Sequence, residues 1–500
     1  MTVIYAAAEP LISYTFDQGG SDLRQIAPIA AVTLTLVVAI LVDLVLPRAR
    51  RGPVVAVISV VGLTVALGLA ALMWWQGGGH SAYFGFATGD SLAVYFEILF
   101  SVLGILTVIV SHTYIQRRDF LEAEFHVLTL AAVAGMMVLG SALSLVTVFL
   151  GLELLSIALY VACGFARRQT TSQEAAAKYL LVGGFASAFV LYGMALVYGA
   201  SGSTRLTDIA QRIGPNEASN SLLLLGVLLL GVGFAFKISG APFHQWTPDV
   251  YQGAPLPVTA FMSVGTKAAA FAMIIRVFNY ALPHAGVEWQ ALLAFVAAAS
   301  MIVGNLMAIV QTSVKRLLAY SGVAQGGYML IGVLAGGQRG IGAVLFYLVA
   351  YLFMNFGAFA MLTVLVTHEG EHDQLEDLHG LAGRYPVLGV LMSVFMLSLA
   401  GFPPLVGFFG KLFLFTAGIS AGWTWLVIIA VLTSVLSVAY YLRVVYHVWT
   451  PVAEGREVVR APGPLIAVSV SALLSVVLGI LPAAVQAAGF IGASPVVAGR

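Results

Sequence analysis

The sequence predicts an all-α polytopic membrane protein of about fourteen transmembrane helices. Of its 500 residues, 60% are hydrophobic and only 9% are charged, and the mean hydropathy is +0.98. A soluble domain carries about 25% charged residues, so this much apolar sequence requires lipid as a second apolar solvent. The net charge of +1 gives no reason to expect a nucleic-acid partner.

Fourteen apolar runs have about the 20 residues that a membrane-spanning helix needs. Turn signals such as Gly77 to Gly79 and Pro462 to Pro464 separate several of them. The runs lack the alternation of a barrel wall, which argues against strands. The predicted spans are residues 26–46, 54–75, 92–114, 126–143, 145–165, 174–199, 220–239, 256–281, 289–311, 317–335, 340–367, 387–419, 423–449 and 463–484.

Basic residues are distributed unevenly between the two sets of connections, and Lys and Arg concentrate on the cytoplasmic side of membrane proteins. We therefore expect the richer set to be cytoplasmic and, with fourteen spans, both termini to lie outside. The richer set comprises Arg48, Arg50, Arg51, Arg117, Arg118, Arg167, Arg168, Lys315, Arg316, Arg384, Arg456 and Arg460. The poorer set comprises Arg24, Arg205, Arg212, Arg339 and Arg500. We expect no removable signal peptide in Met1 to Gln25.

Two predicted spans are interrupted by proline. The seventh runs into Lys237 to Pro242, and the twelfth contains Gly401 to Pro404. Proline removes a backbone donor and breaks a helix, and in a membrane the freed groups need protein or water partners. The two breaks lie five spans apart, in helices of opposite direction. This pattern is typical of the inverted repeats of transporters and indicates where the pathway lies.

Four of the five lysines lie inside or at the edge of an apolar span. Lys267 lies about twelve residues into the eighth span, Lys237 just before the first break, and Lys411 just after the second. Ionisable groups in such positions are functional by default. Lys315, next to Arg316, is predicted to be an ordinary interface anchor.

Glu153, in the fifth span, is predicted to be the only acidic residue near the middle of any span. Burial disfavours the charged form of an amine and a nearby carboxylate favours it. A carboxylate near Lys237 would therefore switch that lysine between holding and releasing a proton. The alternative is a structural ion pair, but one glutamate cannot neutralise three central lysines.

Two further residues have two interpretations each. Lys178 lies one turn after Glu174, so it is either part of a relay or a snorkelling member of an exposed pair. His244 follows the first break and suits proton uptake, although a capping or loop histidine is the alternative.

No cofactor or metal site is predicted in this chain. The histidines of the polar loop from His368 to His379 have no accompanying thiolate or compact metal-site signature. The single cysteine, Cys163, cannot hold an iron–sulfur cluster. There is no dinucleotide fingerprint and no phosphate loop.

Five long stretches carry a family resemblance. They are GLELLSIALY from Gly151, EAAAKYLLVGGFASAFVLYGMALVYGASGS from Glu174, FAFKISGAPFHQWTPDVYQGAPLPVTAF from Phe234, SVGTKAAAF from Ser263 and LAGFPPLVGFFGKLFLF from Leu399. Through them the sequence resembles the antiporter-like membrane subunits of the proton-pumping NADH–quinone oxidoreductase, respiratory complex I. The lysine at 411 and the short C-terminal tail make it most similar to the subunit N family.

The resemblance implies a fold of fourteen helices with two inverted five-helix repeats and two discontinuous helices, 7 and 12. It also implies a role for each candidate. Glu153 would modulate Lys237, Lys267 would be the central lysine, and Lys411 would lead to the exit. Lys178 matches an additional lysine of helix 6, and His244 lies near the uptake side. The implied segments are 1–125 with helices 1–3, 126–285 with helices 4–8, 286–450 with helices 9–13, and 451–500 with helix 14 and the tail.

The function implied is that of a proton-translocating subunit of a translocase, driven by electron transfer elsewhere. FMN, iron–sulfur clusters, NADH and quinone would be bound by other subunits and none by this chain. The implied partners are the other membrane subunits, including sister antiporter-like subunits, and the lipid bilayer of a bacterial inner membrane. Two alternatives remain: a subunit of a multi-subunit sodium/proton antiporter or membrane-bound hydrogenase, and a scaffold that translocates nothing.

Overall fold

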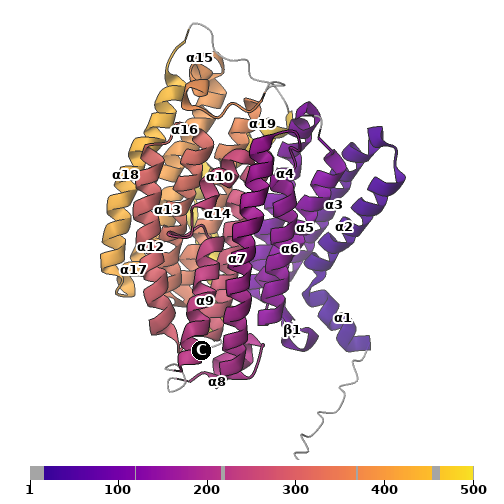
Figure 1. Cartoon of the computed structure of the whole chain (residues 1–500), viewed down its shortest axis with the longest axis vertical. Helices are drawn as coiled ribbons and strands as arrows, with labels where there is room; N and C mark the ends of the chain where they lie inside the picture. Colours follow the sequence, from indigo (N-terminus) through magenta and orange to yellow (C-terminus); the bar gives the residue numbers. More distant parts are fainter. Residues whose placement is uncertain (1–15, 119, 215–219, 367–369, 453–461, 499–500) are drawn as a thin grey trace, which may run out of the picture.

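The computed structural model describes residues 16–118, 120–214, 220–366, 370–452 and 462–498. His368, Arg456, Arg460, Arg500 and most of the segment from Met1 to Gln25 lie outside these ranges. Within them the chain forms an upright bundle of helices (Figure 1). Twelve of the described helices are long and apolar enough to cross a membrane.

The long helices lie at positions where the sequence predicts spans. They are α2 (Ala27–Val45), α3 (Arg48–Trp75), α4 (Ser91–Arg118), α5 (Glu122–Ser141), α6 (Leu145–Cys163), α7 (Thr170–Ser201), α11 (Leu256–Ile274), α12 (Gly286–Ile309), α13 (Val314–Ala335), α14 (Gly337–Val364), α18 (Thr424–Trp449) and α19 (Pro462–Ile480). A π-helical segment, η3 (Ile275–Ala281), extends α11. Within lipid a helix bonds its own backbone groups, which is why uninterrupted apolar runs adopt this form.

The shorter elements mark breaks and ends. They are α1 (Phe16–Gln25), α8 (Leu206–Arg212), α9 (Ser221–Lys237), α10 (Trp246–Gly253), α15 (Leu381–Arg384), α16 (Pro386–Ala400), α17 (Val406–Ser420), α20 (Pro482–Ala498), the 3₁₀ turns η1 (Tyr83–Gly85) and η4 (Leu375–Leu378), and the two-residue strands β1 (Ser81–Ala82) and β2 (Ala87–Thr88). Helices α9, α16 and α17 occupy the two spans predicted to be interrupted. The total of fourteen counts each interrupted segment as one span, and it stays a prediction.

The C-terminal region differs from the prediction. A single helix was expected over 463–484, but α19 ends at Ile480 and Pro482 begins α20, because proline suits the first turn of a new helix. Helix α20 packs against α14 and α4. A Cβ placed on Gly489 would lie 2.7 Å from the Gly342 carbonyl oxygen, so the helices α20 and α14 meet backbone to backbone. The apolar run alone gave no sign of this second helix.

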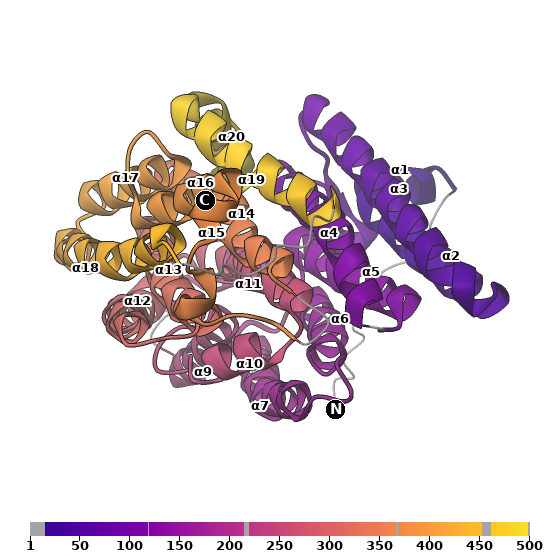
Figure 2. The same ribbon diagram turned by 90° about the horizontal axis from the view of Figure 1, so that it is seen from above.

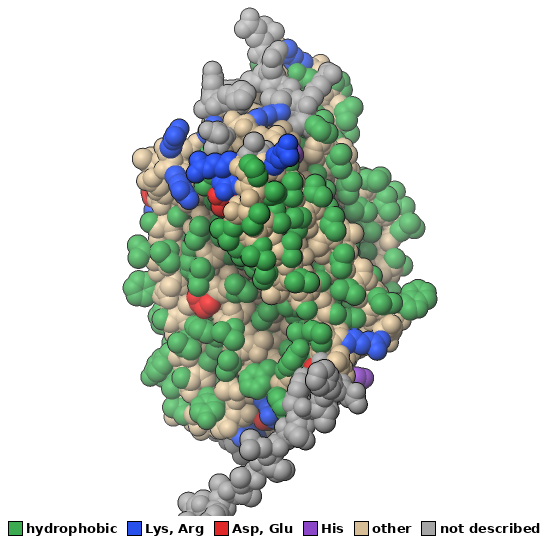
Figure 3. Space-filling view, turned by 90° about the vertical axis from the view of Figure 1, so that its right-hand side faces the viewer, with side chains coloured by type: hydrophobic (Ala, Val, Ile, Leu, Met, Phe, Trp, Pro, Cys, Tyr) green, Lys and Arg blue, Asp and Glu red, His purple; other side chains and the backbone are tan. Residues whose placement is uncertain are grey.

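Helices α11, α13 and α14 lie in the middle of the bundle, between α2 and α3 at one side and α17 and α18 at the other (Figure 2). Their apolar segments are almost wholly buried within the chain. The outer helices expose large apolar side chains, among them Leu181, Phe185 and Val435. Figure 3 shows a broad apolar belt, with Lys and Arg side chains gathered toward the upper end. Helix α1 and the C-terminal end of the described chain both lie toward the lower end (Figure 1).

The same local link occurs at opposite ends of the bundle. Ser144 caps α6 and forms an isolated bridge with Arg205, beside α8 at the lower end. Ser313 caps α13 and forms an isolated bridge with Gln374, near α15 at the upper end. In each case the amide of the residue after the serine also donates to the facing segment. Leu145 N donates to Thr204 O (2.8 Å), and Val314 N donates to Asp373 O (2.6 Å). Helices α6 and α13 therefore begin with matching backbone links.

Candidate functional site

The first break separates α9 from α10, as the sequence predicts. Helix α9 ends at Lys237, and the backbone groups freed there find partners inside the protein. The amide of Ala241 donates to Ser300 Oγ (2.8 Å), and Trp246 Nε1 donates to the Phe236 carbonyl oxygen (3.3 Å). These partners are what a break at membrane depth requires.

Lys237 is 3% exposed, and its Nζ donates to Ser156 Oγ on α6 at 2.7 Å. The ammonium also lies 5.9 Å from the ring centre of Tyr160, within cation–π range. Glu153 lies one turn before Ser156 on α6 and is partly buried. No ion pair within 4.0 Å joins the Glu153 carboxylate to Lys237 in the described chain, although their charges interact. Glu153 and Lys237 therefore interact through their charges and not through a direct ion pair, and Ser156 is the hydrogen-bond partner of Lys237.

We expect Ser156→Ala to remove the hydrogen bond that positions the Lys237 ammonium. A hydrogen bond to a charged group contributes about 1.5–3 kcal/mol, and the described residues offer Lys237 no acidic partner within 4.0 Å that could replace it. The expected result is a several-fold fall in proton uptake by membrane vesicles, smaller than that caused by Lys237→Ala. Ser475→Ala, which removes a buried hydroxyl of α19 that bonds to its own helix at Ser471 O (2.8 Å), is the matched control. Equal activity of Ser156→Ala and Ser475→Ala would contradict the prediction.

Lys267 is fully buried in α11. Its Nζ lies 3.4 Å from Ser239 Oγ, in the first break, and 5.9 Å from the ring centre of Tyr251. A Cβ placed on Gly322 of α13 would lie 3.4 Å from this Nζ, so the amine rests against bare backbone. The described residues offer it no acidic partner within 4.0 Å.

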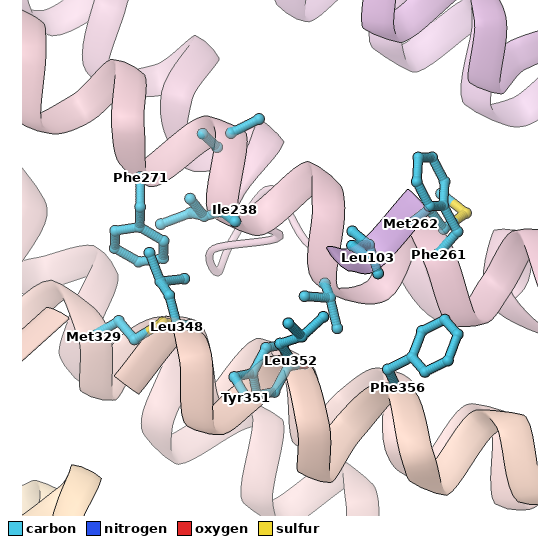
Figure 4. Close-up of a cluster of buried hydrophobic side chains, with 14 of the residues drawn as sticks. Leu103, Ile238, Phe261, Met262, Phe271, Met329, Leu348, Tyr351, Leu352 and Phe356 are labelled. Atoms are coloured by element: carbon cyan, nitrogen blue, oxygen red, sulfur yellow. The ribbon is translucent and has the colours of Figure 1, made fainter. Parts of the chain in front are cut away.

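Apolar side chains surround this part of the bundle. Figure 4 shows Phe271 of α11 beside Leu348 of α14 and Ile238 of the first break, with Met329 of α13 nearby. Phe271 lies one turn after Lys267 on the same helix. Such packing separates the amine from lipid and bulk water, so its charge depends on the few polar groups that reach it.

The second break separates α16 from α17, again as predicted. Lys411, 5% exposed, donates from Nζ to the Ala400 carbonyl oxygen and to Ser434 Oγ, both at 2.9 Å. A cation at the C-terminal end of a helix interacts favourably with the helix dipole. Gly401 ends α16 with φ +93°, a conformation that glycine adopts at little cost. Lys411 therefore also fixes the end of the half-helix that precedes it.

Neutral polar side chains lie between Lys267 and Lys411, and sequence reasoning missed them. Ser321, next to Gly322, bonds to Tyr441 at 2.5 Å, and Gln325 Nε2 donates to the Tyr441 hydroxyl at 3.2 Å. Tyr347 donates to Gln325 Oε1. The Gln325 amide also reaches the carbonyl oxygen of Leu399, beside Ala400, at 3.5 Å. The signal that could have revealed them is the spacing of Ser321, Gln325 and Tyr328 along one face of α13.

Lys178 and His244 lie apart from this row. Lys178 is 42% exposed and pairs with Glu174 (2.6 Å) and with Asp249 of α10 (2.8 Å). These contacts agree with the interpretation of Lys178 as a member of an exposed ion pair. His244 is half-buried after the first break, with its ring centre 6.2 Å from that of Tyr320. Neither residue forms a hydrogen bond or an ion pair with Lys237, Lys267 or Lys411 in the described chain.

One sequence interpretation was wrong, and two buried charged residues were overlooked. Lys315 is no interface anchor: it is 1% exposed, pairs with Glu371 (2.8 Å) and donates to the Ala254 carbonyl oxygen (2.8 Å). The loop that carries Glu371 covers the start of α13, which the sequence could not show. Glu97 was overlooked: it is fully buried, but it lies near the start of α4 and not near the middle of a span. Arg276, in η3 at the end of the predicted eighth span, was overlooked as well.

Within the described ranges, no three His, Cys, Asp or Glu side chains converge as metal ligands. The arrangement is a line of three buried amines, each held by hydroxyl or carbonyl oxygens. Amines of this kind can take up and release protons, and hydroxyl and amide groups can connect them.

Comparison with known proteins places this geometry in a family. Residues 142–437 match the family described as NADH:quinone oxidoreductase/Mrp antiporter, TM. A protein named NADH-quinone oxidoreductase subunit N from Trichlorobacter lovleyi is 43% identical over 465 residues, covering 92% of this chain and 95% of the relative. A chain of respiratory complex I from Thermus thermophilus has a TM-score of 0.79 and 36% identity, covering 92% of this chain and 98% of that chain.

A chain of the Mrp complex from a Dietzia species has the same fold, with a TM-score of 0.80 and 20% identity over 97% of this chain and 98% of that chain. The family match covers more than half of the sequence and includes both breaks and all three buried lysines. This chain therefore belongs to the NADH:quinone oxidoreductase/Mrp antiporter transmembrane family.

Proposed function

We propose that this chain is a subunit-N-type membrane subunit of an NADH–quinone oxidoreductase and that it translocates protons. The observation that carries the proposal is the row of Lys237, Lys267 and Lys411, which are all buried and form no ion pair within 4.0 Å among the described residues. A scaffold would gain nothing from three buried amines without an ion pair, because such charge in the interior is costly. The relatives named subunit N support the choice of complex.

In this proposal protons enter from the upper, cytoplasmic end near His244 and reach Lys237. They pass to Lys267 and leave by way of Lys411. The Ser239 hydroxyl and the group of Ser321, Gln325 and Tyr441 would connect successive amines. Glu153 would set the charge of Lys237 through the turn of α6 that carries Ser156, and Lys178 would adjust the charge near the uptake side.

The division into segments is part of the proposal. Residues 126–285 and 286–450 would form two inverted repeats, flanked by 1–125 and 451–500. The matching links of Ser144 and Ser313 at opposite ends of the bundle support it. So do the two interrupted helices, one in each repeat. The excess of Lys and Arg at the upper end supports a cytoplasmic assignment of that end, with both termini on the outer face of a bacterial inner membrane.

FMN, iron–sulfur clusters, NADH and quinone would be bound by other subunits of the complex. The exposed apolar side chains of the outer helices would contact lipid and neighbouring membrane subunits, including sister antiporter-like subunits.

The test of the proposed function is Lys237→Ala. We expect the complex to assemble on a native gel, while NADH-driven proton uptake by membrane vesicles and the NADH–quinone reductase rate both fall, because the relay loses an amine that can change its charge. Unchanged proton uptake in the assembled complex would show that Lys237 is structural. Sodium/proton exchange that persists without NADH would instead favour an antiporter.

A further inference from the structure

A second group of ionisable side chains lies away from the lysine row. Arg276 follows Lys267 by nine residues, which at about 100° per residue is about two and a half turns of helix. The two side chains therefore leave opposite faces of the α11–η3 element. Lys267 rests against α13, whereas Arg276 donates to the Gly140 carbonyl oxygen of α5 at 3.0 and 3.2 Å.

Arg276 is fully buried and forms a two-point ion pair with Asp90, which precedes α4. Its Nη1 lies 2.6 Å from Asp90 Oδ2, and its Nη2 lies 2.7 Å from Asp90 Oδ1. Such bidentate pairs are among the strongest hydrogen-bonded contacts. Asp90 Oδ1 also accepts from the amide of Ala93 (2.9 Å) and so caps α4. The guanidinium is thus already neutralised by Asp90, whose side chain is 16% exposed.

Glu97 lies two turns after Asp90 on α4 and is fully buried. Neither of its carboxyl oxygens has a hydrogen-bond partner among the described residues. Its charge interacts with both Asp90 and Arg276. One guanidinium cannot neutralise two carboxylates, and an unpaired buried carboxylate costs several kcal/mol. Asp90, Glu97 and Arg276 therefore have no net charge together when one of the two carboxyl groups is protonated.

A purely structural interpretation explains Asp90 and Arg276 but not Glu97. The ion pair joins the start of α4 to η3 and to α5, and it needs no third member. The Glu97 side chain makes no hydrogen bond among the described residues that would stabilise the fold, so glutamine or an apolar residue would serve as well. An ionisable group kept at such a position in a membrane protein indicates use.

We propose that Glu97 is a proton-binding residue, separate from the lysine row, that exchanges its proton with the lower end of the bundle through Asp90. While Arg276 pairs with Asp90, Glu97 keeps the proton. When the guanidinium turns to Glu97, the Glu97 O–H bond breaks, the proton crosses the two helical turns by way of water, and an O–H bond forms on Asp90. Water at the exposed edge of Asp90 then accepts that proton. The inference rests on the proposed function, because it requires a complex that moves protons.

The test compares Glu97→Gln, Glu97→Asp and Ser101→Ala in the assembled complex. Glutamine keeps the shape of a protonated glutamate without a proton to release, and aspartate keeps the carboxyl group. Ser101 lies one turn further along α4 and bonds to the Glu97 carbonyl oxygen (2.7 Å), so its variant controls for local packing. The measurements are NADH-driven proton uptake and the infrared difference spectrum between oxidised and NADH-reduced complex, in the region of protonated carboxyl groups.

We expect Glu97→Gln to lower proton uptake several-fold and to remove one carboxyl band. Glu97→Asp should retain uptake and shift that band, and Ser101→Ala should match the unsubstituted complex. Wild-type uptake and an unchanged spectrum in Glu97→Gln would overturn the inference. If Glu97→Gln does not assemble, an unshifted band in Glu97→Asp overturns it. The two proposals fail separately: loss of uptake in Lys237→Ala alongside normal uptake in Glu97→Gln refutes only the role of Glu97.

Discussion

Lys267→Ala is expected to reduce NADH-driven proton uptake by about tenfold or more, because each ~1.4 kcal/mol added to a barrier lowers a rate tenfold. Lys267 makes the longest hydrogen bond of the three lysines: its Nζ lies 3.4 Å from Ser239 Oγ, whereas Lys237 and Lys411 bond to oxygens at 2.7 and 2.9 Å. Its charge is therefore the least compensated, and its proton is the most easily moved. Alanine removes the amine that lies between the first break and α13.

The measurement is proton uptake by inverted membrane vesicles, with the NADH–quinone reductase rate and a native gel on the same preparation. Thr266→Ala is the matched control, since Thr266 is buried one residue away and its hydroxyl bonds to its own helix, at Met262 O (2.6 Å). Normal uptake in an assembled Lys267→Ala complex would show that the three lysines do not form one pathway. Equal losses in both variants would point to a packing defect.

The sequence predicted those features that composition and proline encode directly. Apolar runs gave the positions of the long helices, because lipid-facing and core-facing helices alike must be apolar. Pro242 and Pro403 gave the two breaks, because a proline cannot continue the helix that precedes it. Buried lysines could be recognised because an ionisable side chain in the middle of an apolar run is rare unless it has a function.

Contacts between distant segments could not be predicted in the same way. Lys237 binds Ser156, a neutral residue that carries no signal in an apolar helix, so the sequence directed attention to Glu153 alone. Lys315 follows a polar loop and looked like an anchor until the fold placed Glu371 over it. Arg276 lies close to the end of a predicted span, where a basic residue is usual, and its burial depends on Asp90 reaching it from the start of α4.

The second large effect is expected from Gly407→Ala, in the first turn of α17. A Cβ at this position would lie 1.9 Å from the Ser398 carbonyl oxygen of α16, well inside contact distance. The obstacle is backbone rather than a side chain that could rotate away. The Gly407 amide also donates to Ser398 Oγ (3.3 Å), and that bond would be lost if α17 moved outward. Overpacking of this kind typically costs about 1–3 kcal/mol.

We therefore expect Gly407→Ala to lower both the amount of assembled complex and the temperature at which its NADH–quinone reductase activity is lost. Gly184→Ala is the control, because a Cβ on that glycine of α7 meets nothing within 4 Å and alanine favours a helix. The second break also holds Lys411 against Ala400 O, so displacement of α17 should impair proton uptake in the complex that does assemble. A Gly407→Ala complex as stable and active as Gly184→Ala would show that α16 and α17 are less closely packed than described.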